Sequence, residues 1–332
     1  WWYEKQCIWR TLLVGALLGF IALVRPSNIL VFFILLLWDV KSFRDFGQRV
    51  IFFLKKWPYV LLMIAAFFVI WIPQFLYWKA VTGHFLFYSY GAEGGAFYWL
   101  HPNILDSLFS YRKGWFVYTP IMLIAVLGIY LLRKRIPQLF LPLVFLVVFM
   151  IYVQSSWWSW WFGGGFGLRA YVDIYGLLAI PLAAVLEYTF SNSRKVVRIG
   201  VPSVIVFLVL FQLLQHWQYR KNIIHYVGMH KELYWKSFMK FKRPWDYWVS
   251  LSLPDHRLAR KSIYVYYDSG REDYKELETM EEAEGIQTVV EMIENDKKLY
   301  REVLRYGKRE EISSEEAVSE VAERMYIRMT DK

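Results

Sequence analysis

The stretch WPYVLLMIAAFFVIWIPQFLYW, residues 57–78, contains no charged side chain over 22 positions. About 20 apolar residues are enough for a helix to cross the hydrocarbon layer of a bilayer. Across all 332 residues the hydrophobic share is 57%, above the roughly 45–50% of ordinary globular proteins. The sequence therefore predicts an all-α polytopic membrane protein. The expected spans are residues 9–24, 26–40, 57–78, 116–132, 137–153, 171–188 and 197–217.

The first two of these spans are short and are separated by the sequence RPSN, residues 25–28. Proline lacks a backbone N–H and disfavours helical geometry at the residue before it, here Arg25. The pair is therefore expected to be either a tight hairpin or one kinked helix.

Charge distribution predicts the orientation of the spans. Residues 1–217 contain 18 Lys and Arg against seven Asp and Glu, whereas residues 218–332 contain 21 against 22, so the net charge of +10 belongs to the membrane part and does not indicate nucleic-acid binding. Basic short loops remain on the cytoplasmic side. The basic connectors at 41–56, 133–135 and 194–198 are therefore expected to be cytoplasmic. The connectors at about 79–115 and 154–170, and the tail, are then expected outside.

The tail, residues 218–332, is expected to form a small, mainly helical extracytoplasmic domain. Residues 262–268 (SIYVYYD) predict a strand. Ile286, Val289, Val290 and Ile293 recur at the spacing of an amphipathic helix. The first 217 residues form the transmembrane domain in this interpretation.

Unusual polar residues gather in the segments expected outside. Charges at membrane depth are costly and usually contact a cavity or a partner. Arginine donors match phosphate oxygens, aromatic rings stack on sugars, and carboxylates accept hydrogen bonds from hydroxyls or act as bases. The candidate substrate-binding residues are Arg25, His101, Arg112, Lys113, Trp161, Arg169 and Asp173, and the weak catalytic candidates are Glu93 and Asp106.

Each candidate also has a purely structural interpretation. The tryptophans of SSWWSWWFGGGFGLRAYVD, residues 155–173, are typical of a membrane interface. Arg112 and Lys113 can anchor a span at the headgroups, and Arg169 with Asp173 can form an ion pair across one helical turn. Glu93 can be an exposed loop residue, Asp106 a helix cap, and His101 a structural residue.

Three segments in order carry a family resemblance. GALLGFIALVRPSNILVFFILLL, residues 15–37, resembles the Gly-rich, Arg-Pro-containing helical pair of membrane glycosyltransferases of the GT-C type, which include protein O-mannosyltransferases and aminoarabinose transferases. FSYRKGWFVYTP and WWFGGGFGLRAYVD resemble segments of uncharacterised bacterial relatives of the Bacteroidetes type. The likeness covers about residues 9–240.

The resemblance implies a polyprenyl-phosphate sugar donor, an active site at the outer membrane face, inverting transfer and often a divalent metal ion. In that class the catalytic acid follows the first span. This chain, which begins WWYEKQ, is expected to start downstream of that acid as a C-terminal fragment that is inactive alone. Arg25, on the Arg-Pro motif, is the residue carried over, as a partner of the lipid phosphate.

The resulting expectation is a hexosyl- or pentosyltransferase of the bacterial cytoplasmic membrane, acting on a glycan, lipid or protein acceptor. No protein metal ligands are assigned. One rival is a transporter or flippase for a polar or lipid-linked solute, which predicts broken helices near the midplane and repeat symmetry. The other is a noncatalytic membrane scaffold whose tail recruits partners.

Overall fold

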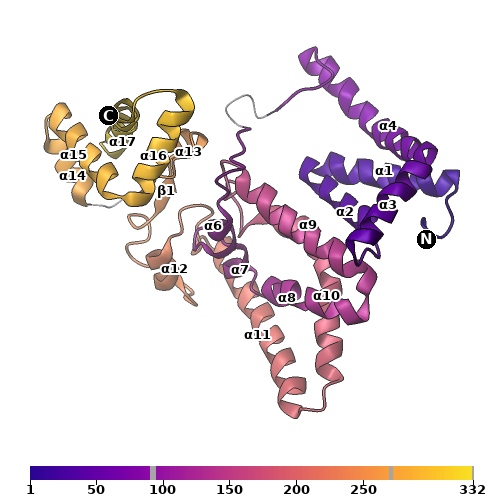
Figure 1. Ribbon diagram of the computed structural model, residues 1–332. Coiled ribbons are helices and arrows are strands. Elements are labelled where there is room, and N and C mark those ends of the chain that lie inside the picture. The colour runs from indigo at the N-terminus through magenta and orange to yellow at the C-terminus, as the bar shows by residue number, and fades with distance from the viewer. Residues whose placement is uncertain (90–94, 269–271, 331–332) are drawn as a thin grey trace. The chain divides into compact units, whose positions relative to one another are not determined.

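The computed structural model describes residues 1–89, 95–268 and 272–330, and it is about 69% helical. Two compact units divide the chain. Unit 1 comprises Trp1–Gly91, Ile121–Gln154 and Tyr171–Val206, and unit 2 comprises Ala92–Pro120, Ser155–Ala170 and Phe207–Lys332. Figure 1 labels the elements of both units.

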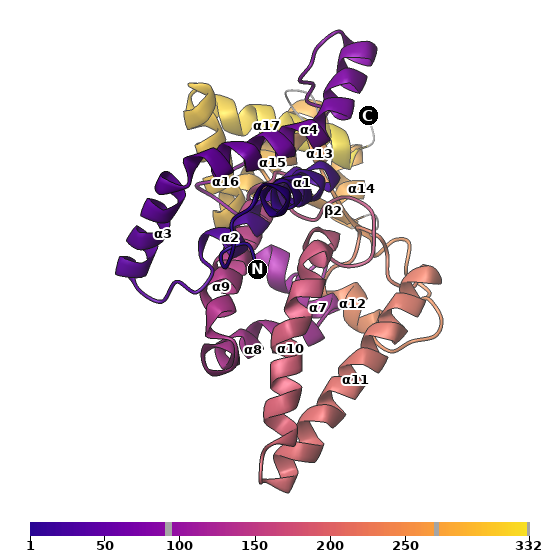
Figure 2. The same cartoon turned by 90° about the vertical axis from the view of Figure 1, so that its right-hand side faces the viewer.

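Unit 1 is built from apolar helices. Its elements are α1 (Ile8–Val24), η1 (Pro26–Val31), α2 (Phe32–Leu36), α3 (Phe43–Lys55), α4 (Trp57–Thr82), α8 (Ile121–Arg135), most of α9 (Pro137–Ser156), most of η2 (Arg169–Ile174), α10 (Tyr175–Phe190) and the first part of α11 (Lys195–Arg220). In Figure 2, α10 and α11 are joined by the short turn at 191–194.

Among the described residues, four helical segments are long and apolar enough to cross a membrane. They are Trp57–Thr82, Pro137–Ser156, Arg169–Phe190 and Lys195–Arg220. The expected spans at 57–78, 137–153, 171–188 and 197–217 lie within them, and the architecture is that of an all-α membrane protein. Each segment contains an internal proline, namely Pro73, Pro142, Pro181 and Pro202.

The expected span at 116–132 is interrupted in the structure. Residues 115–118 form the short helix α7 (Trp115–Tyr118), and α8 begins only at Ile121. Thr119 has φ −139° and ψ 62°, because the following Pro120 disfavours helical geometry at the residue before it. The apolar run therefore contains a helix of 15 residues and not one full span.

α1 and α4 lie side by side in both views (Figures 1 and 2). Their backbones approach closely where α1 has Gly15 and Gly19. A Cβ atom at Gly15 would lie 2.3 Å from the carbonyl oxygen of Met63, and one at Gly19 would lie 2.8 Å from that of Phe67. Small residues four positions apart are the usual way in which membrane helices pack at short distance.

The Arg-Pro sequence breaks the first apolar segment. Arg25 is extended (φ −156°, ψ 122°), and η1 starts at Pro26.

Pro142, inside α9, leaves the carbonyl of Gln138 without its usual helical donor, because proline has no N–H. The backbone N–H of Asp39 donates to this carbonyl instead, at 3.1 Å. The chain thus satisfies a carbonyl that would otherwise lack its helical partner.

α3 corresponds to the basic connector at 41–56. The Ser42 hydroxyl caps its N-terminus by accepting from the N–H of Asp45. Phe52 and Phe53 pack around Trp2 with ring centroids 5.9 and 6.1 Å away. Since α3 is amphipathic, it has the pattern of a helix that lies in the plane of a membrane interface.

Unit 2 contains the first long connector from residue 92 on, the second long connector and the tail. Its elements are α6 (Ile104–Phe109), α7, α12 (Lys231–Ser237), β1 (Ser252–Pro254), α13 (His256–Arg260), β2 (Tyr266–Asp268), α14 (Glu272–Thr279), α15 (Glu282–Asn295), α16 (Lys297–Glu310) and α17 (Ser314–Met329). β1 and β2 pair antiparallel, with Leu253 opposite Tyr267. Of the strand expected at 262–268, only β2 forms.

The tail has its own hydrophobic core within unit 2. Val289 and Ile293, from the expected amphipathic helix, are fully buried on α15 against residues of α16 and α17. α15 and α17 approach closely, because a Cβ at Gly285 would lie 2.3 Å from Cε2 of Tyr326.

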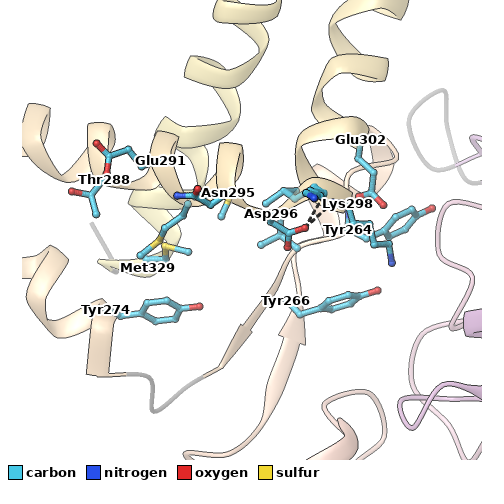
Figure 3. Close-up of a pocket in the computed structure, with 15 residues that line it drawn as sticks. Tyr264, Tyr266, Tyr274, Thr288, Glu291, Asn295, Asp296, Lys298, Glu302 and Met329 are labelled. Carbon is cyan, nitrogen blue, oxygen red and sulfur yellow. Dashed lines mark hydrogen bonds between the residues drawn. The ribbon is translucent and has the colours of Figure 1, made fainter.

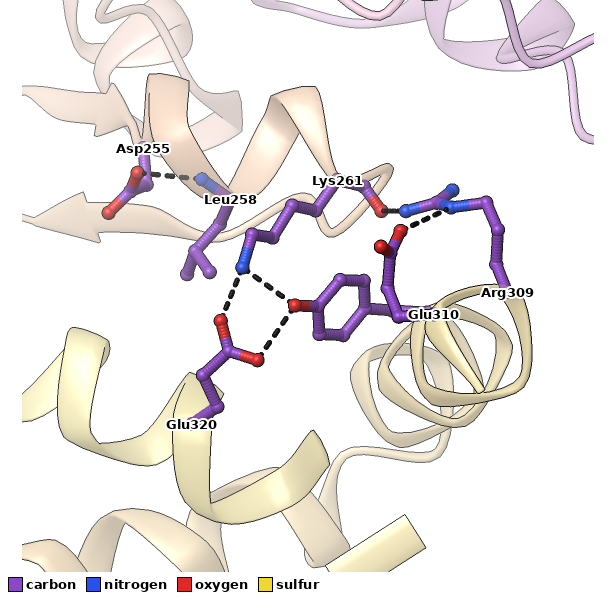
Figure 4. A network of polar contacts seen from close by, with 7 residues as sticks. Asp255, Leu258, Lys261, Arg309, Glu310 and Glu320 are labelled. Carbon is purple, nitrogen blue, oxygen red and sulfur yellow. Dashed lines mark hydrogen bonds and ion pairs between the residues drawn. The ribbon is translucent and has the colours of Figure 1, made fainter. Parts of the chain in front are cut away.

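A polar network ties α13 to the last two helices (Figure 4). The Lys261 ammonium donates to the hydroxyl of Tyr306 at 2.7 Å and forms an ion pair with Glu320. The Tyr306 hydroxyl donates in turn to Glu320 at 2.7 Å. The three side chains satisfy one another and fix the register of α16 against α17.

Candidate functional site

An ion pair in unit 1 joins two of the sequence candidates. Nη1 of Arg25 lies 2.7 Å from Oδ2 of Asp173, although 148 positions separate them. Arg25 occupies the extended break between α1 and η1, and Asp173 lies on η2. Their side chains are 33% and 26% exposed, so both retain contact with the surroundings.

Other polar groups of unit 1 lie at the same helix break. Nε2 of the buried Gln154, near the end of α9, donates to Oγ of Ser27 at 3.0 Å. Asn28 is buried, and its Oδ1 has no hydrogen-bond partner within residues 1–89, 95–268 and 272–330. An unsatisfied buried polar atom of this kind needs an explanation, and a ligand is one. We call Arg25, Ser27, Asn28, Gln154 and Asp173 the helix-break cluster.

Sequence reasoning missed three members of this cluster. Ser27 and Asn28 belong to the RPSN sequence and could have been noticed as polar residues inside an apolar run. Gln154 lies at the end of an apolar run, and no pattern in the sequence distinguishes it as a site residue. The Arg169–Asp173 ion pair considered as one alternative does not account for Asp173, which pairs with Arg25.

A second group of candidates lies in unit 2, around the glycine turn. Lys113 is only 1% exposed, and its ammonium donates to the carbonyl of Gly165. Gly165 adopts φ +149°, a conformation that side-chain-bearing residues rarely adopt. Burial, and then the positive charges of Arg169 and Arg112, lower the pKa of Lys113 to about 7.

His225 belongs to the same electrostatic environment. Burial, with the charges of Lys113 and Arg112, lowers its pKa to about 4. Its Nδ1 accepts the N–H groups of Val227 and Gly228 at 3.2 and 2.8 Å, as a neutral imidazole does. We call Arg112, Lys113, Arg169 and His225 the basic cluster.

The two arginines of the basic cluster differ in their contacts. Arg112 is 6% exposed, donates to the carbonyls of Val227 and Ser252 at 2.5 and 2.7 Å, and stacks over the ring of Tyr266 at 4.0 Å. It therefore holds backbone segments of unit 2 together. Arg169 is exposed, and its guanidinium makes no hydrogen bond or ion pair with the described residues.

The tryptophans of residues 155–173 are mostly core residues. Trp158, Trp160 and Trp161 are at most 7% exposed and form one hydrophobic cluster with Val227 and Ala259. Trp161 therefore contributes packing and presents little ring surface to a ligand.

The remaining candidates, His101, Asp106 and Glu93, do not belong to the basic cluster. His101 is exposed and lines a cavity of about 640 Å³ that also includes Arg305 and Arg309. Burial, and then the charge of Arg305, lower the pKa of His101. Oδ2 of Asp106 lies 3.7 Å from the Lys298 ammonium. Glu93 lies outside the described residues.

Across the described ranges no group of three or more His, Cys, Asp or Glu residues is placed to hold a metal ion. In comparisons with known proteins, no family model, curated protein or solved structure matches the chain.

Proposed function

We propose that the protein is a glycosyltransferase of the bacterial cytoplasmic membrane. It takes a sugar from a polyprenyl-phosphate donor and passes it to a glycan, lipid or protein acceptor on the outer face, where the connectors and the tail lie. The donor's phosphodiester carries one negative charge, its lipid tail lies in the bilayer, and its sugar lies among polar side chains.

The observation that carries the proposal is the basic cluster. Lys113 is a buried amine whose neighbouring charges are positive, so its ammonium form is unfavourable unless an anion lies beside it. Arg169, exposed and without an ion pair among the described residues, has free donors beside the same glycine turn. A phosphate group placed there would accept from Arg169 and restore the charge balance of Lys113.

The helix-break cluster supports the same proposal from unit 1. An arginine and a buried amide at the break of an apolar segment, with the η2 carboxylate paired to the arginine, are costly in a membrane, and such residues usually contact a substrate. Within unit 1, Arg25 has donors that match phosphate oxygens and Asp173 has acceptors that match sugar hydroxyls, whatever the basic cluster of unit 2 contacts. As the bond from the sugar to phosphate breaks, positive charge next to the leaving phosphate lowers the barrier.

A transporter for a lipid-linked solute is the second candidate, favoured by the prolines inside the four long apolar segments and the break at Arg25. Interrupted helices line the substrate sites of many transporters. Both functions require a lipid-phosphate site, but only the transferase breaks the bond between sugar and phosphate.

The test uses membranes that contain the protein and a polyprenyl-phosphate sugar with a photoreactive group in the lipid and a radiolabel in the sugar. Cross-linking measures donor binding, and release of labelled sugar measures transfer. Lys113→Met, Arg169→Ala and Arg25→Ala are compared at matched expression with Lys195→Ala, an exposed cation at the start of α11.

We expect all three site variants to lose cross-linking about tenfold or more, since a charge-assisted hydrogen bond contributes about 1.5–3 kcal/mol, while Lys195→Ala resembles the wild type. Equal cross-linking in all variants would refute the phosphate site. Specific cross-linking with movement of intact donor and no sugar release would favour the transporter.

A further inference from the structure

The tail contains a groove that the proposed function does not use. Its volume is about 850 Å³, and β2, α14, α15, α16 and α17 line it (Figure 3). Sites for small organic ligands have volumes of about 300–1,000 Å³, so this groove has room for several sugar rings.

One wall of the groove is aromatic. Figure 3 shows Tyr266 and Tyr274 on the side of β2 and α14, and Tyr264 at the end nearest Glu302. The side chains of Met292, Met325 and Met329 add apolar surface. Flat tyrosine rings beside flexible methionine side chains suit a ligand with apolar faces.

The opposite wall is polar. Thr288, Glu291 and Asn295 line the groove from α15, and their spacing of three and four residues places them on one face of that helix. Glu291 and Asn295 are exposed. Together they offer a hydroxyl, a carboxylate and an amide along the groove, which is a row of acceptors and donors opposite the tyrosines.

A buried carboxylate closes one end. Glu302 is 6% exposed, and its Oε2 accepts the N–H of Tyr264 at 2.8 Å. Its Oε1 makes no hydrogen bond with any residue that the structure describes. Burial raises the pKa of Glu302. A buried carboxyl with an unused oxygen at the end of a groove is a hydrogen-bonding position for a ligand hydroxyl.

The charges of the lining do not favour an anionic ligand. Glu291, Asp296 and Glu302 face the groove with Lys297 and Lys298. The Asp296 carboxylate already caps α16 by accepting two backbone N–H groups. The lining therefore combines aromatic faces with hydrogen-bonding groups and has a net charge close to zero or slightly negative.

We propose that this groove binds a neutral oligosaccharide. The apolar face of a sugar ring lies on Tyr274, and the hydroxyls hydrogen-bond to Glu291, Asn295 and Glu302. The inference does not depend on the transfer reaction, because it concerns only binding in the tail.

The test uses the full chain in lipid nanodiscs and three neutral probes, namely cellotriose, chitotriose and maltotriose. Isothermal calorimetry measures each dissociation constant, and saturation-transfer NMR identifies the sugar protons in contact. Tyr274→Ala and Asn295→Ala are compared with Glu294→Ala, an exposed residue of α15 that does not line the groove.

We expect at least one probe to bind saturably, Tyr274→Ala and Asn295→Ala to weaken it about fivefold to tenfold, and Glu294→Ala to leave it unchanged. Three results would each overturn the proposal: no saturable binding of any probe to the wild type, equal binding by all variants, or tighter binding of trigalacturonate than of the neutral probes. Loss of donor cross-linking in the Lys113 or Arg169 variants has no bearing on these outcomes, so the two proposals can fail separately.

Discussion

The buried lysine of the basic cluster makes donor binding depend on pH. A pKa of about 7 means that Lys113 is about half protonated at pH 7 and about 1% protonated at pH 9. The phosphodiester of a polyprenyl-phosphate sugar keeps its single negative charge over this interval. If the bound anion requires the ammonium form, affinity falls about 50-fold between pH 7 and pH 9, which corresponds to about 2.3 kcal/mol.

Stability of the ligand-free protein should change in the opposite sense. The unfolded chain has an ordinary lysine and stays protonated to about pH 10, so between pH 7 and pH 9 it binds more protons than the folded chain. Unfolding free energy therefore rises with pH over this interval, by about 2.3 kcal/mol from Lys113. Lys113→Met removes both dependences, because its side chain does not titrate.

Two assays in the same detergent check this reasoning. Donor affinity is measured by photo-cross-linking at pH 7, 8 and 9, and thermal unfolding is followed at the same pH values. Lys113→Arg is the decisive control, since arginine stays charged throughout and should bind the donor with no pH dependence. Wild-type affinity that is constant from pH 7 to 9, or that falls in parallel in Lys113→Arg, would refute the role of the lysine.

Three substitutions test the packing of unit 2, and a fourth, Gly176→Ala in unit 1, is a control. Gly285→Ala should lower the free energy of unfolding by about 1–3 kcal/mol through overpacking, even though alanine favours helices more than glycine does. Gly176→Ala should be neutral or stabilising in the same thermal melt, because no described heavy atom lies within 4 Å of the added Cβ. Lys261→Met removes a partly exposed ion pair with Glu320 and should cost about 1 kcal/mol, visible as a drop of a few degrees; no change in Tm would contradict the network in Figure 4. Arg112→Met leaves two buried carbonyls without their donor and should cost about 3 kcal/mol, seen as protease sensitivity of the tail; a fully stable variant would refute this structural role of Arg112.

The helical membrane architecture could be predicted because length and hydropathy are local properties. Residues 57–78 predicted a span, and α4 continues to Thr82, where Gly83 ends it in a left-handed conformation (φ +80°). The interruption before α8 was also visible locally, since Pro120 follows Thr119, but an apolar run hides such a break when only hydropathy is read.

The candidate site was predictable residue by residue but not as a set of contacts. Arg25 and Asp173 were each selected as costly charges, yet their pairing spans 148 positions and depends on how α1 and η2 pack. Arg112 and Lys113 looked alike in sequence as adjacent cations. Only the fold distinguishes the arginine that bonds to backbone carbonyls from the lysine that is buried beside the glycine turn.

Because α1 and α4 approach closely, insertion of α1 into the membrane and its packing against α4 can be affected separately by a single substitution. Gly15→Leu makes α1 more hydrophobic, so the translocon should insert it into the bilayer at least as readily. The added side chain would nevertheless meet the backbone of Met63, and the two helices could not pair at their present distance. Such a variant should be inserted into the membrane but fail to assemble, and membrane proteases should then degrade it.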